Sequence, residues 1–156
     1  MMLTVAEASV ADAPAILALQ RLAYESEARL YDAWSLPPLT QSLESLVAEF
    51  EHSLVIKATL PDALVGSVRA RVVAGTCSIG RLVVHPAHQG QGIGSQLLRE
   101  AEARSPGVTK YELFTGSKSE GNIRLYQRHG YTITSVRQLS PTLAITYLER
   151  LSRTAA

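Results

Sequence analysis

Three glycines at alternate positions, Gly90, Gly92 and Gly94, mark the part of the chain whose residue types are best suited to chemistry. They follow an apolar, strand-like run that ends at Val84, and apolar residues at helical spacing come after them. The first amides of a helix lack intrahelical acceptors and carry the positive end of its dipole, so anions bind there. Glycine also lets the backbone approach a phosphate closely. We therefore expect this loop to wrap a phosphate-bearing, nucleotide-like ligand with its own amides.

Two common phosphate-binding loops do not fit this segment. A P-loop has Lys followed by Ser or Thr after its last glycine, whereas Ser95 and Gln96 stand there in this chain. A dinucleotide-binding fingerprint requires glycine at position 95 or a small residue at position 97, which are Ser95 and Leu97. Glu112 has the spacing of a ribose-binding carboxylate but falls within an apolar strand pattern. A nucleotide-binding protein of another fold stays open only as an alternative.

The segment Gln89-Gly90-Gln91-Gly92-Ile93-Gly94 resembles motif A of the GNAT superfamily of N-acetyltransferases, which is written Arg/Gln-x-x-Gly-x-Gly/Ala. The resemblance implies that the loop amides hold the pyrophosphate of acetyl-CoA. It also implies that the preceding strand, residues 76–84, pairs with the pantetheine arm. The cofactor-binding residues implied in this way are Leu82, Val83, Val84, Gln89, Gly90, Gln91, Gly92, Ile93, Gly94 and Ser95.

A second segment, residues 119–131, resembles motif B of the same superfamily, a helix that ends in Tyr-x-x-x-Gly-Phe/Tyr. Tyr126, Gly130 and Tyr131 occupy those places. The superfamily often carries Asn seven residues before the Tyr, where this chain has Ser119, and its own Asn122 stands only four before. The resemblance covers most of the chain, although only residues 66–131 carry specific motifs.

The motif B segment also has the pattern of a helix with one polar stripe. Ser117, with Glu120 three residues later, predicts a capping-box start, and Gly130 suits the residue that ends a helix. Helical spacing places Ser119, Asn122 and Tyr126 on one face, at i, i+3 and i+7. We expect this stripe to face the same ligand as the glycine loop.

Acyl transfer needs a free amine, a polarised thioester carbonyl and a proton for the departing thiolate. The resemblance assigns the proton donor to Tyr126, whose phenol is protonated at neutral pH. It assigns the carbonyl contact to a strand amide near Val83 or Val84. No residue is uniquely placed as the general base, and the candidates are Glu112, His85, Glu25 and Glu27.

The superfamily builds its acceptor pocket from the N-terminal helices and the closing hairpin, which directs attention to an aromatic and acidic set near the start of the chain. That set suits a cationic, partly apolar amine, and its members are Tyr24, Glu25, Tyr31, Trp34 and the turn Leu36-Pro37-Pro38-Leu39. Four basic side chains are candidates to contact the phosphates of the cofactor, namely His88, Lys118, Arg124 and Arg128.

Composition limits the remaining classes of function. With 156 residues the chain is expected to form one domain, 1–156, that folds without metal or disulfide. A net charge of +1 gives no global attraction to nucleic acid or membrane. The single Cys77 is expected to be a buried packing residue, and no histidine pair has metal-ligand spacing. Because no apolar run is long enough to span a bilayer and no signal peptide is visible, a cytoplasmic location is expected.

The periodicity of the chain predicts antiparallel strands first and helix-linked strands later, an α+β arrangement. Strands are expected at residues 3–6, 54–59, 64–73, 76–84, 110–115, 131–139 and 142–148. Helices are expected at 12–30 and 42–50, after the glycine loop of motif A, and in the motif B segment. A turn is expected at Pro37-Pro38. This is the order of the GNAT acyl-CoA N-acyltransferase fold, a mixed, mostly antiparallel twisted sheet of six or seven strands flanked by about four helices.

The sequence thus favours an N-acetyltransferase that uses acetyl-CoA, without a metal, on a primary amine of a small molecule or peptide. A non-catalytic CoA-binding or sensing module of the same fold is the alternative, since it would keep the glycine loop without needing Tyr126. The sequence leaves open whether the chain acts as a monomer or a homodimer.

Overall fold

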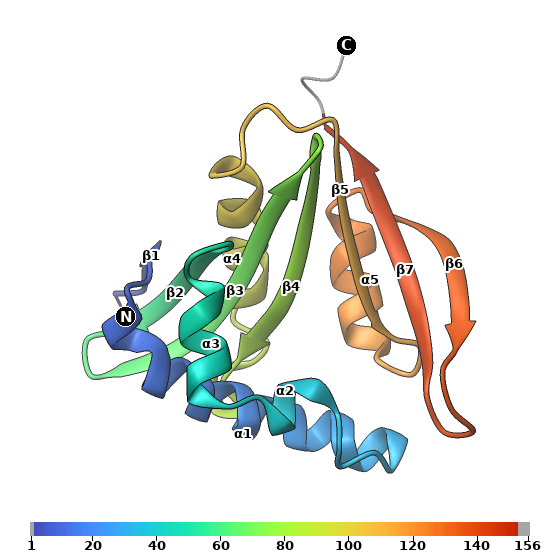
Figure 1. Cartoon of the computed structure of the whole chain (residues 1–156), viewed down its shortest axis with the longest axis horizontal. Helices are drawn as coiled ribbons and strands as arrows, with labels where there is room; N and C mark the ends of the chain where they lie inside the picture. Colours follow the sequence, from blue (N-terminus) through green and yellow to red (C-terminus); the bar gives the residue numbers. More distant parts are fainter. Residues whose placement is uncertain (1, 153–156) are drawn as a thin grey trace.

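A seven-stranded sheet in the order β1-β2-β3-β4-β5-β7-β6 organises the computed structural model, which describes residues 2–152. Every neighbouring pair is antiparallel except β4 and β5, which run parallel (Figure 1). The strands are β1 (Thr4–Glu7), β2 (Leu54–Leu60), β3 (Ala63–Val73), β4 (Thr76–Val84), β5 (Lys110–Gly116), β6 (Thr132–Gln138) and β7 (Ala144–Leu151). The predicted α+β class and mixed, mostly antiparallel sheet are confirmed.

Helices cover both faces of the sheet (Figure 1). On one face lie α1 (Ala13–Tyr31), α2 (Pro37–Thr40) and α3 (Leu43–Glu49), and on the other lie α4 (Ile93–Ala103) and α5 (Glu120–Arg128). Two single-turn 3-10 helices, Val10–Asp12 and Pro86–His88, precede α1 and α4.

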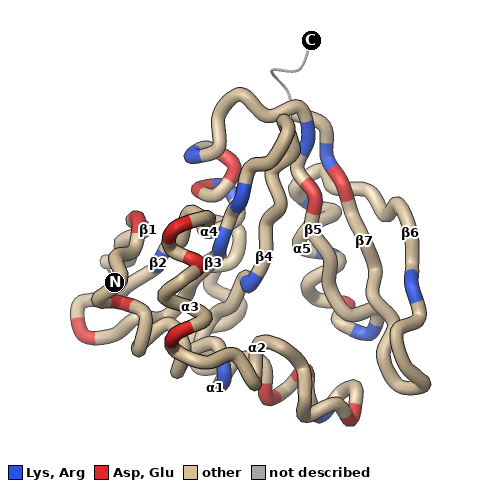
Figure 2. The backbone as a smooth tube through the Cα atoms, viewed as in Figure 1, with Lys and Arg blue, Asp and Glu red and all other residues tan. Residues whose placement is uncertain are grey.

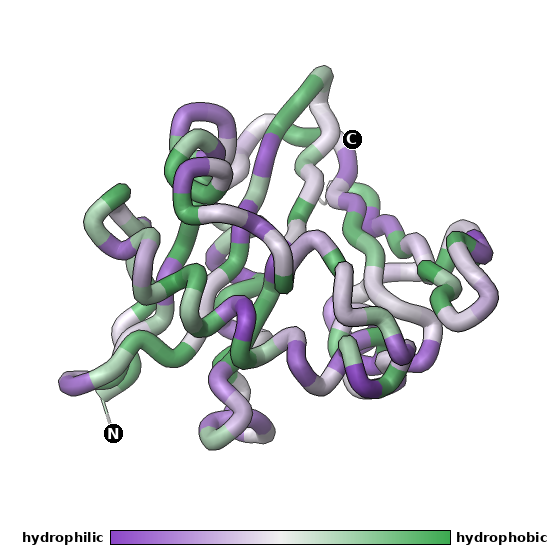
Figure 3. Tube along the Cα trace, turned by 60° about the horizontal axis from the view of Figure 1, so that its bottom comes forward, coloured by the Kyte–Doolittle hydropathy of each residue, from purple (hydrophilic) through white to green (hydrophobic). Residues whose placement is uncertain are grey.

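Two hydrophobic clusters hold these layers together. The larger packs α4 and α5 against the sheet through fully buried side chains such as Ile56, Leu97 and Leu148. The smaller packs α1 and α3 against β2, with Ile16 and Leu46 at its centre. Hydrophobic and hydrophilic stretches accordingly alternate along the trace (Figure 3). The sheet is therefore anchored from both sides, which fixes the strand ends between the helices.

Two local predictions are corrected by the structure. The expected turn at Pro37-Pro38 is one turn of helix, because proline fixes the φ angle that the first helical position needs. The expected capping box of Ser117 and Glu120 is wrong: Ser119 is the N-cap residue of α5, and the Ser117 hydroxyl instead pairs with Thr146 Oγ1 at 2.8 Å.

A β-bulge and an early end of pairing shape the centre of the sheet. Ser67 pairs with Val83 but Arg69 pairs with Gly80, so β4 holds one residue more than β3 over this stretch. Arg81 lies inside the bulge with φ 51°, a left-handed conformation that is uncommon for a residue with a side chain. Pairing of β4 with β5 covers only Thr76–Ser78, and beyond it the two strands separate (Figure 1).

Charges are spread along the chain and no helix is built to cross a bilayer. Acidic and basic residues alternate over both halves of the molecule (Figure 2). Within residues 2–152, every helix is too short or too polar to span a membrane.

The C-terminal end of α1 reaches β5 through one close contact. Tyr31 is 2% exposed, and its ring lies directly over Gly116, the last residue of β5. A Cβ built on Gly116 would lie 2.7 Å from Tyr31 Cε2 and closer still to the phenol oxygen. Glycine is therefore required at this position so that α1 can pack against the end of β5.

We expect Gly116→Ala to lower the free energy of unfolding by about 1–3 kcal/mol, because the added methyl group forces the buried Tyr31 ring away. Urea unfolding followed by circular dichroism measures this. Gly80→Ala is the matched control, since a Cβ on Gly80 meets nothing within 4 Å, and its effect should stay within about 0.5 kcal/mol. Equal stabilities of the two variants would contradict the packing argument.

Candidate active site

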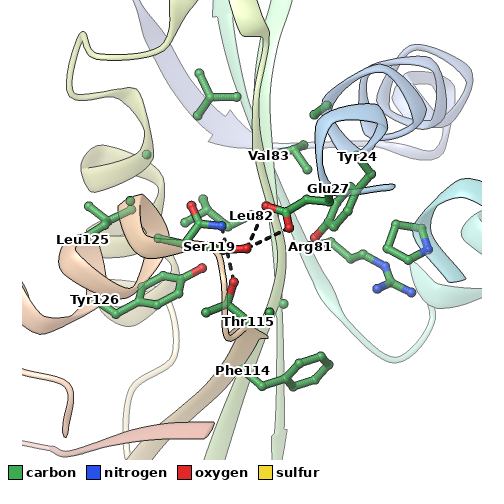
Figure 4. Close-up of a pocket in the computed structure, with 18 of the residues that line it drawn as sticks. Tyr24, Glu27, Arg81, Leu82, Val83, Phe114, Thr115, Ser119, Leu125 and Tyr126 are labelled. Carbon is green, nitrogen blue, oxygen red and sulfur yellow. Dashed lines mark hydrogen bonds between the residues drawn. The ribbon is translucent and has the colours of Figure 1, made fainter. Parts of the chain in front are cut away.

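A cavity of about 880 Å³ occupies the gap where β4 and β5 separate. Its walls come from α1 and α2 on one side, from the glycine loop and α5 on the other, and from the hairpin between β6 and β7. The close-up in Figure 4 shows Glu27, Ser119 and Tyr126 directed into this space from α1 and α5. The cavity therefore joins the glycine loop to the first helix of the chain.

The glycine loop has the conformation expected of an anion-binding turn. Gly90 and Gly92 have φ 78° and 81°, and both line the cavity. The Gln96 N–H donates to the Gly92 carbonyl at 3.1 Å, so the amides of residues 93–95 precede the hydrogen-bonded ladder of α4. The positive end of the α4 dipole is thus directed at the cavity.

All but one of the residues predicted to bind the cofactor line this cavity. Gln91 is exposed and lies outside its lining. Those in the lining are Leu82, Val83, Val84, Gln89, Gly90, Gly92, Ile93, Gly94, Ser95, Ser119, Asn122 and Tyr126. The structure therefore brings the two sequence motifs together on one cavity.

Tyr126 projects from α5 into the middle of the cavity. It is 6% exposed, and Figure 4 shows its hydroxyl directed toward Ser119 and the open space between the strands. Burial raises the pKa of Tyr126 far above the ordinary phenol value, and Tyr24 and the Glu27 carboxylate raise it further. The neighbouring Asn122 donates to Thr115 Oγ1 at 3.4 Å. Tyr126 therefore presents a protonated phenol at neutral pH.

A chain of hydrogen bonds joins α1 to the start of α5. The Lys118 amide donates to the Tyr31 hydroxyl at 2.7 Å, and the Ser119 hydroxyl donates to the Glu27 carboxylate at 2.7 Å. Because the Ser119 proton is used on Glu27, the 3.1 Å contact between Tyr31 and Ser119 has Tyr31 as its donor. Burial raises the pKa of Tyr31, so its phenol keeps the proton that it donates. Glu27 is the final acceptor of this chain.

Of the four candidate bases, only Glu27 lines the cavity. The Glu112 carboxylate accepts a hydrogen bond from Ser78 Oγ at 2.9 Å, at the paired end of β4 and β5 and away from the gap. His85 accepts from the Ala87 amide at 3.0 Å and lies outside the lining, as does Glu25. The structure thus does not bring Glu112 together with Tyr126.

The predicted acceptor residues divide in the same way. Trp34 is 56% exposed and, like Glu25 and Leu39, lies outside the lining, whereas the rest of the set forms one wall: Tyr24, Tyr31, Leu36, Pro37 and Pro38. Among the predicted phosphate contacts, His88, Arg124 and Arg128 line the cavity and Lys118 does not.

Several lining residues carry no signal in the sequence. Arg81 reaches the cavity only because of the bulge in β4, which periodicity does not reveal. Phe114 and Thr115 line it because β5 has lost its neighbour there, and the closing hairpin adds Leu139, Leu143, Ile145 and Tyr147. The sequence predicts a strand at residues 110–115, but which edge of that strand faces a cavity depends on pairing across the chain.

No metal site is present in the part of the chain that the structure describes, since no group of three or more His, Cys, Asp or Glu side chains is placed to hold an ion. Cys77 is fully buried in β4, and burial raises the pKa of its thiol. Its packing role, predicted from the sequence, agrees with this burial.

Comparisons with known proteins agree with the geometry. The model of the acetyltransferase (GNAT) family matches residues 15–131. The PaiA N-acetyltransferase of Thermoplasma acidophilum, solved with coenzyme A, superposes with a TM-score of 0.79 at 16% identity, covering 97% of this chain and 100% of that one. The putative acetyltransferase yncA of Salmonella typhimurium, solved with acetyl-CoA, gives 0.78 at 24% identity, covering 100% and 98%.

A third solved structure, an acetyltransferase of the GNAT family from Streptococcus pneumoniae, superposes with a TM-score of 0.77 at 20% identity, covering 96% of this chain and 99% of that one. A comparison with curated protein sequences gives no significant match. At these identities the solved structures establish the fold.

We expect Tyr126 to stay protonated at about pH 10, where a free phenol is half ionised. The physical reason is that a phenolate would be desolvated beside Glu27. Ultraviolet titration of the native protein and of Tyr126→Phe measures this, because ionisation of a phenol raises the absorbance near 295 nm whereas the absorbance of Trp34 does not change with pH. The two curves should coincide up to about pH 10.5. A loss of one phenolate equivalent in the variant below that pH would disprove the burial argument.

Proposed function

Because the chain belongs to the acetyltransferase (GNAT) family, we propose that it transfers the acetyl group of acetyl-CoA to the primary amine of a small molecule or peptide. The observation that carries the proposal is the single cavity that runs from the glycine loop, through the gap between β4 and β5, to the α1 wall. Such a cavity can hold an acyl donor at one end and an amine at the other, with the phenol of Tyr126 between them.

The donor would occupy the glycine-loop end of the cavity. The amides of residues 93–95 and the α4 dipole suit a pyrophosphate, and Arg124 and Arg128 add positive charge nearby, with His88 also in the lining. Coenzyme A and acetyl-CoA are bound in the two solved relatives named above. The proposed cofactor residues are those of the predicted set that line the cavity.

The open edge of β4 would hold the pantetheine arm and the thioester. The His85 amide donates to the Val65 carbonyl on β3 at 2.8 Å. Since successive amides of a strand alternate in direction, the Val84 N–H points the other way, into the gap that β5 has left. This amide is the proposed donor to the thioester carbonyl, where it would stabilise the negative charge that develops during attack.

The reaction joins the amine nitrogen to the acetyl carbon and breaks the carbon–sulfur bond of the thioester. An ammonium acceptor loses two protons in the process. We assign the first to Glu27, the one candidate base in the lining, which passes it to solvent. The second is released by the nitrogen after attack, and one proton is delivered to the departing thiolate by Tyr126, which is replenished from that nitrogen. The products are an N-acetylated amine, CoA and one proton released to solvent.

The non-catalytic CoA-binding module remains the alternative function. It accounts for the glycine loop equally well, but it gives no reason for a buried phenol directed into the same cavity. Binding of acetyl-CoA and a role for Tyr126 are therefore tested separately.

We expect the native protein to bind one acetyl-CoA, and Gly92→Glu to weaken binding by at least about 100-fold, or about 2.7 kcal/mol. The backbone of the new glutamate must adopt a φ of 81°, and its side chain places a carboxylate where a phosphate would lie. Isothermal titration calorimetry measures both.

Gly107→Glu is the matched control for that experiment. Gly107 also has positive φ, 76°, and open space around its Cα, but it lies outside the large cavity. The Gly107→Glu variant should bind acetyl-CoA with the affinity of the native protein. Unchanged affinity in Gly92→Glu, with both variants folded, would refute the loop assignment.

We expect Tyr126→Phe to lower kcat by about 100-fold or more while the Kd for acetyl-CoA changes less than about threefold, because the phenol proton is needed only when sulfur departs. Release of free thiol with an accepted amine gives kcat, and calorimetry gives Kd. If Tyr126→Phe turned over at the native rate, the phenol would have no part in proton delivery.

A further inference from the structure

The α1 side of the cavity carries two opposite charges on neighbouring elements. We define the acceptor compartment as the lining formed by Tyr24, Glu27, Arg81, Phe114 and Tyr147, together with the apolar side chains of α2 and of the hairpin. Glu27 comes from α1 and Arg81 from the bulge of β4 (Figure 4). Tyr24 interacts electrostatically with both, and Figure 4 shows the three side chains on this side of the cavity.

Arg81 has no anionic partner within residues 2–152. None of the ion pairs found there includes it, and its Nε is shielded from solvent without a hydrogen-bond partner. The neighbouring Arg69 differs, because Glu49, Gln20 and Gln41 all accept from it. The Arg81 guanidinium lies close enough to Arg69 to lower the pKa of that residue, and Tyr24 is its neutral neighbour. A ligand carboxylate would give Arg81 the anionic partner that these residues do not supply.

The backbone that holds Arg81 is itself unfavourable. Its φ of 51° lies in the left-handed region, which raises the free energy of the folded state when the residue carries a side chain. The bulge turns this residue out of the regular alternation of β4, so that its side chain lies on the α1 and α2 side, away from α5 and Tyr126 (Figure 4). Arg81 therefore faces the acceptor compartment, and the phosphate-binding end of the cavity lies elsewhere.

Glu27 supplies the complementary charge. Among the residues that the structure describes, Ser119 alone donates to its carboxylate, which leaves further lone pairs to accept from an ammonium group. Around the two charges the walls are apolar: Phe114 and Tyr147 lie with ring centroids 5.7 Å apart, and Leu36, Leu139 and Leu143 complete the lining.

From this arrangement, and resting on the proposed function, we propose that the acceptor is a free α-amino acid with an apolar or amphipathic side chain. Its ammonium group lies at Glu27, its carboxylate pairs with Arg81, and its side chain lies against Phe114 and Tyr147. The N-terminus of a peptide has no carboxylate beside its ammonium group, so it leaves Arg81 unpaired and is not the favoured acceptor. The bonds formed and broken are those given under the proposed function, and the inference specifies only which class of amine accepts the acetyl group.

The test compares each common L-α-amino acid with its own carboxamide, using acetyl-CoA and thiol release. The amide keeps the ammonium group and side chain but loses the carboxylate, and its amine is the less basic of the two. Since a larger fraction of the amide amine is unprotonated at neutral pH, a preference for the acid reports recognition. We expect native kcat/KM to favour the preferred acid over its amide by about 10- to 100-fold.

Arg81→Gln should remove that preference by raising KM for the acid about 10- to 100-fold. The amide should not lose kcat/KM in the same way, because it has no carboxylate to lose a partner and its ammonium group is no longer repelled by the guanidinium. Arg81→Lys, which keeps the charge without the planar fork, should retain part of the preference. Arg71→Gln is the matched control, because Arg71 is an exposed residue of β3 that lies outside the cavity, and it should keep the native preference.

Two results overturn the inference while leaving the proposed function intact. The first is a protein that binds acetyl-CoA but acetylates no amino acid, or acetylates acid and amide equally. The second is an Arg81→Gln variant that retains the preference. Absence of acetyl-CoA binding in the folded native protein would instead overturn the proposed function, and this inference with it. The native comparison of acid and amide decides the matter even if Arg81→Gln does not fold.

Discussion

The separation of β4 from β5 is the constraint on which the rest of the site depends. Each strand stays paired with its outer neighbour, β4 with β3 on both sides of the bulge and β5 with β7 along its length, whereas their shared edge opens after Ser78 and Glu112. Backbone amides and carbonyls on the open edges are thereby left for a ligand, in the interior of a sheet where they would otherwise pair. An extended donor molecule can add itself as a short strand there, with its reactive end placed by the protein backbone and not by a flexible side chain.

Two elements keep this gap from closing or widening. At the glycine-loop end, α5 fills the space behind the strands through Leu125 and Tyr126, which pack into the main core. On the opposite face of the sheet, Tyr31 crosses from α1 to Gly116 and to the start of α5. Because the same hydrogen-bond chain ends on Glu27, the contact that fixes the width of the gap also fixes the carboxylate in it. The hydrogen bonds that hold α1 against the start of α5 therefore also position the proposed base, Glu27.

The sequence predicted what is local and could not predict what depends on pairing between distant segments. The glycine loop, most element bounds and the α+β class follow from spacing, because loop, strand and helix there are contiguous. The role expected of Tyr126 comes instead from the resemblance of its helix to motif B of the GNAT superfamily. Glu112 and Glu27 were equal candidates by residue type, and only the register of β5, which pairs Glu112 beside Ser78, separates them. Arg81 carried no signal, since a bulge arises from a mismatch between two strands and not from either strand by itself.

The bulge also changes what charge the cavity prefers. The acceptor set predicted from the sequence has Glu25 as its one charged member, beside aromatic residues, and favours a cation. In the structure Glu25 and Trp34 lie outside the cavity, while Glu27 and Arg81 line it, so this side of the cavity carries one acidic and one basic group. A simple cationic amine would then meet repulsion from Arg81, whereas a ligand with both charges is attracted at both ends. One extra residue in β4, beside the open edge of the sheet, thus supplies the side chain that we propose selects among amines.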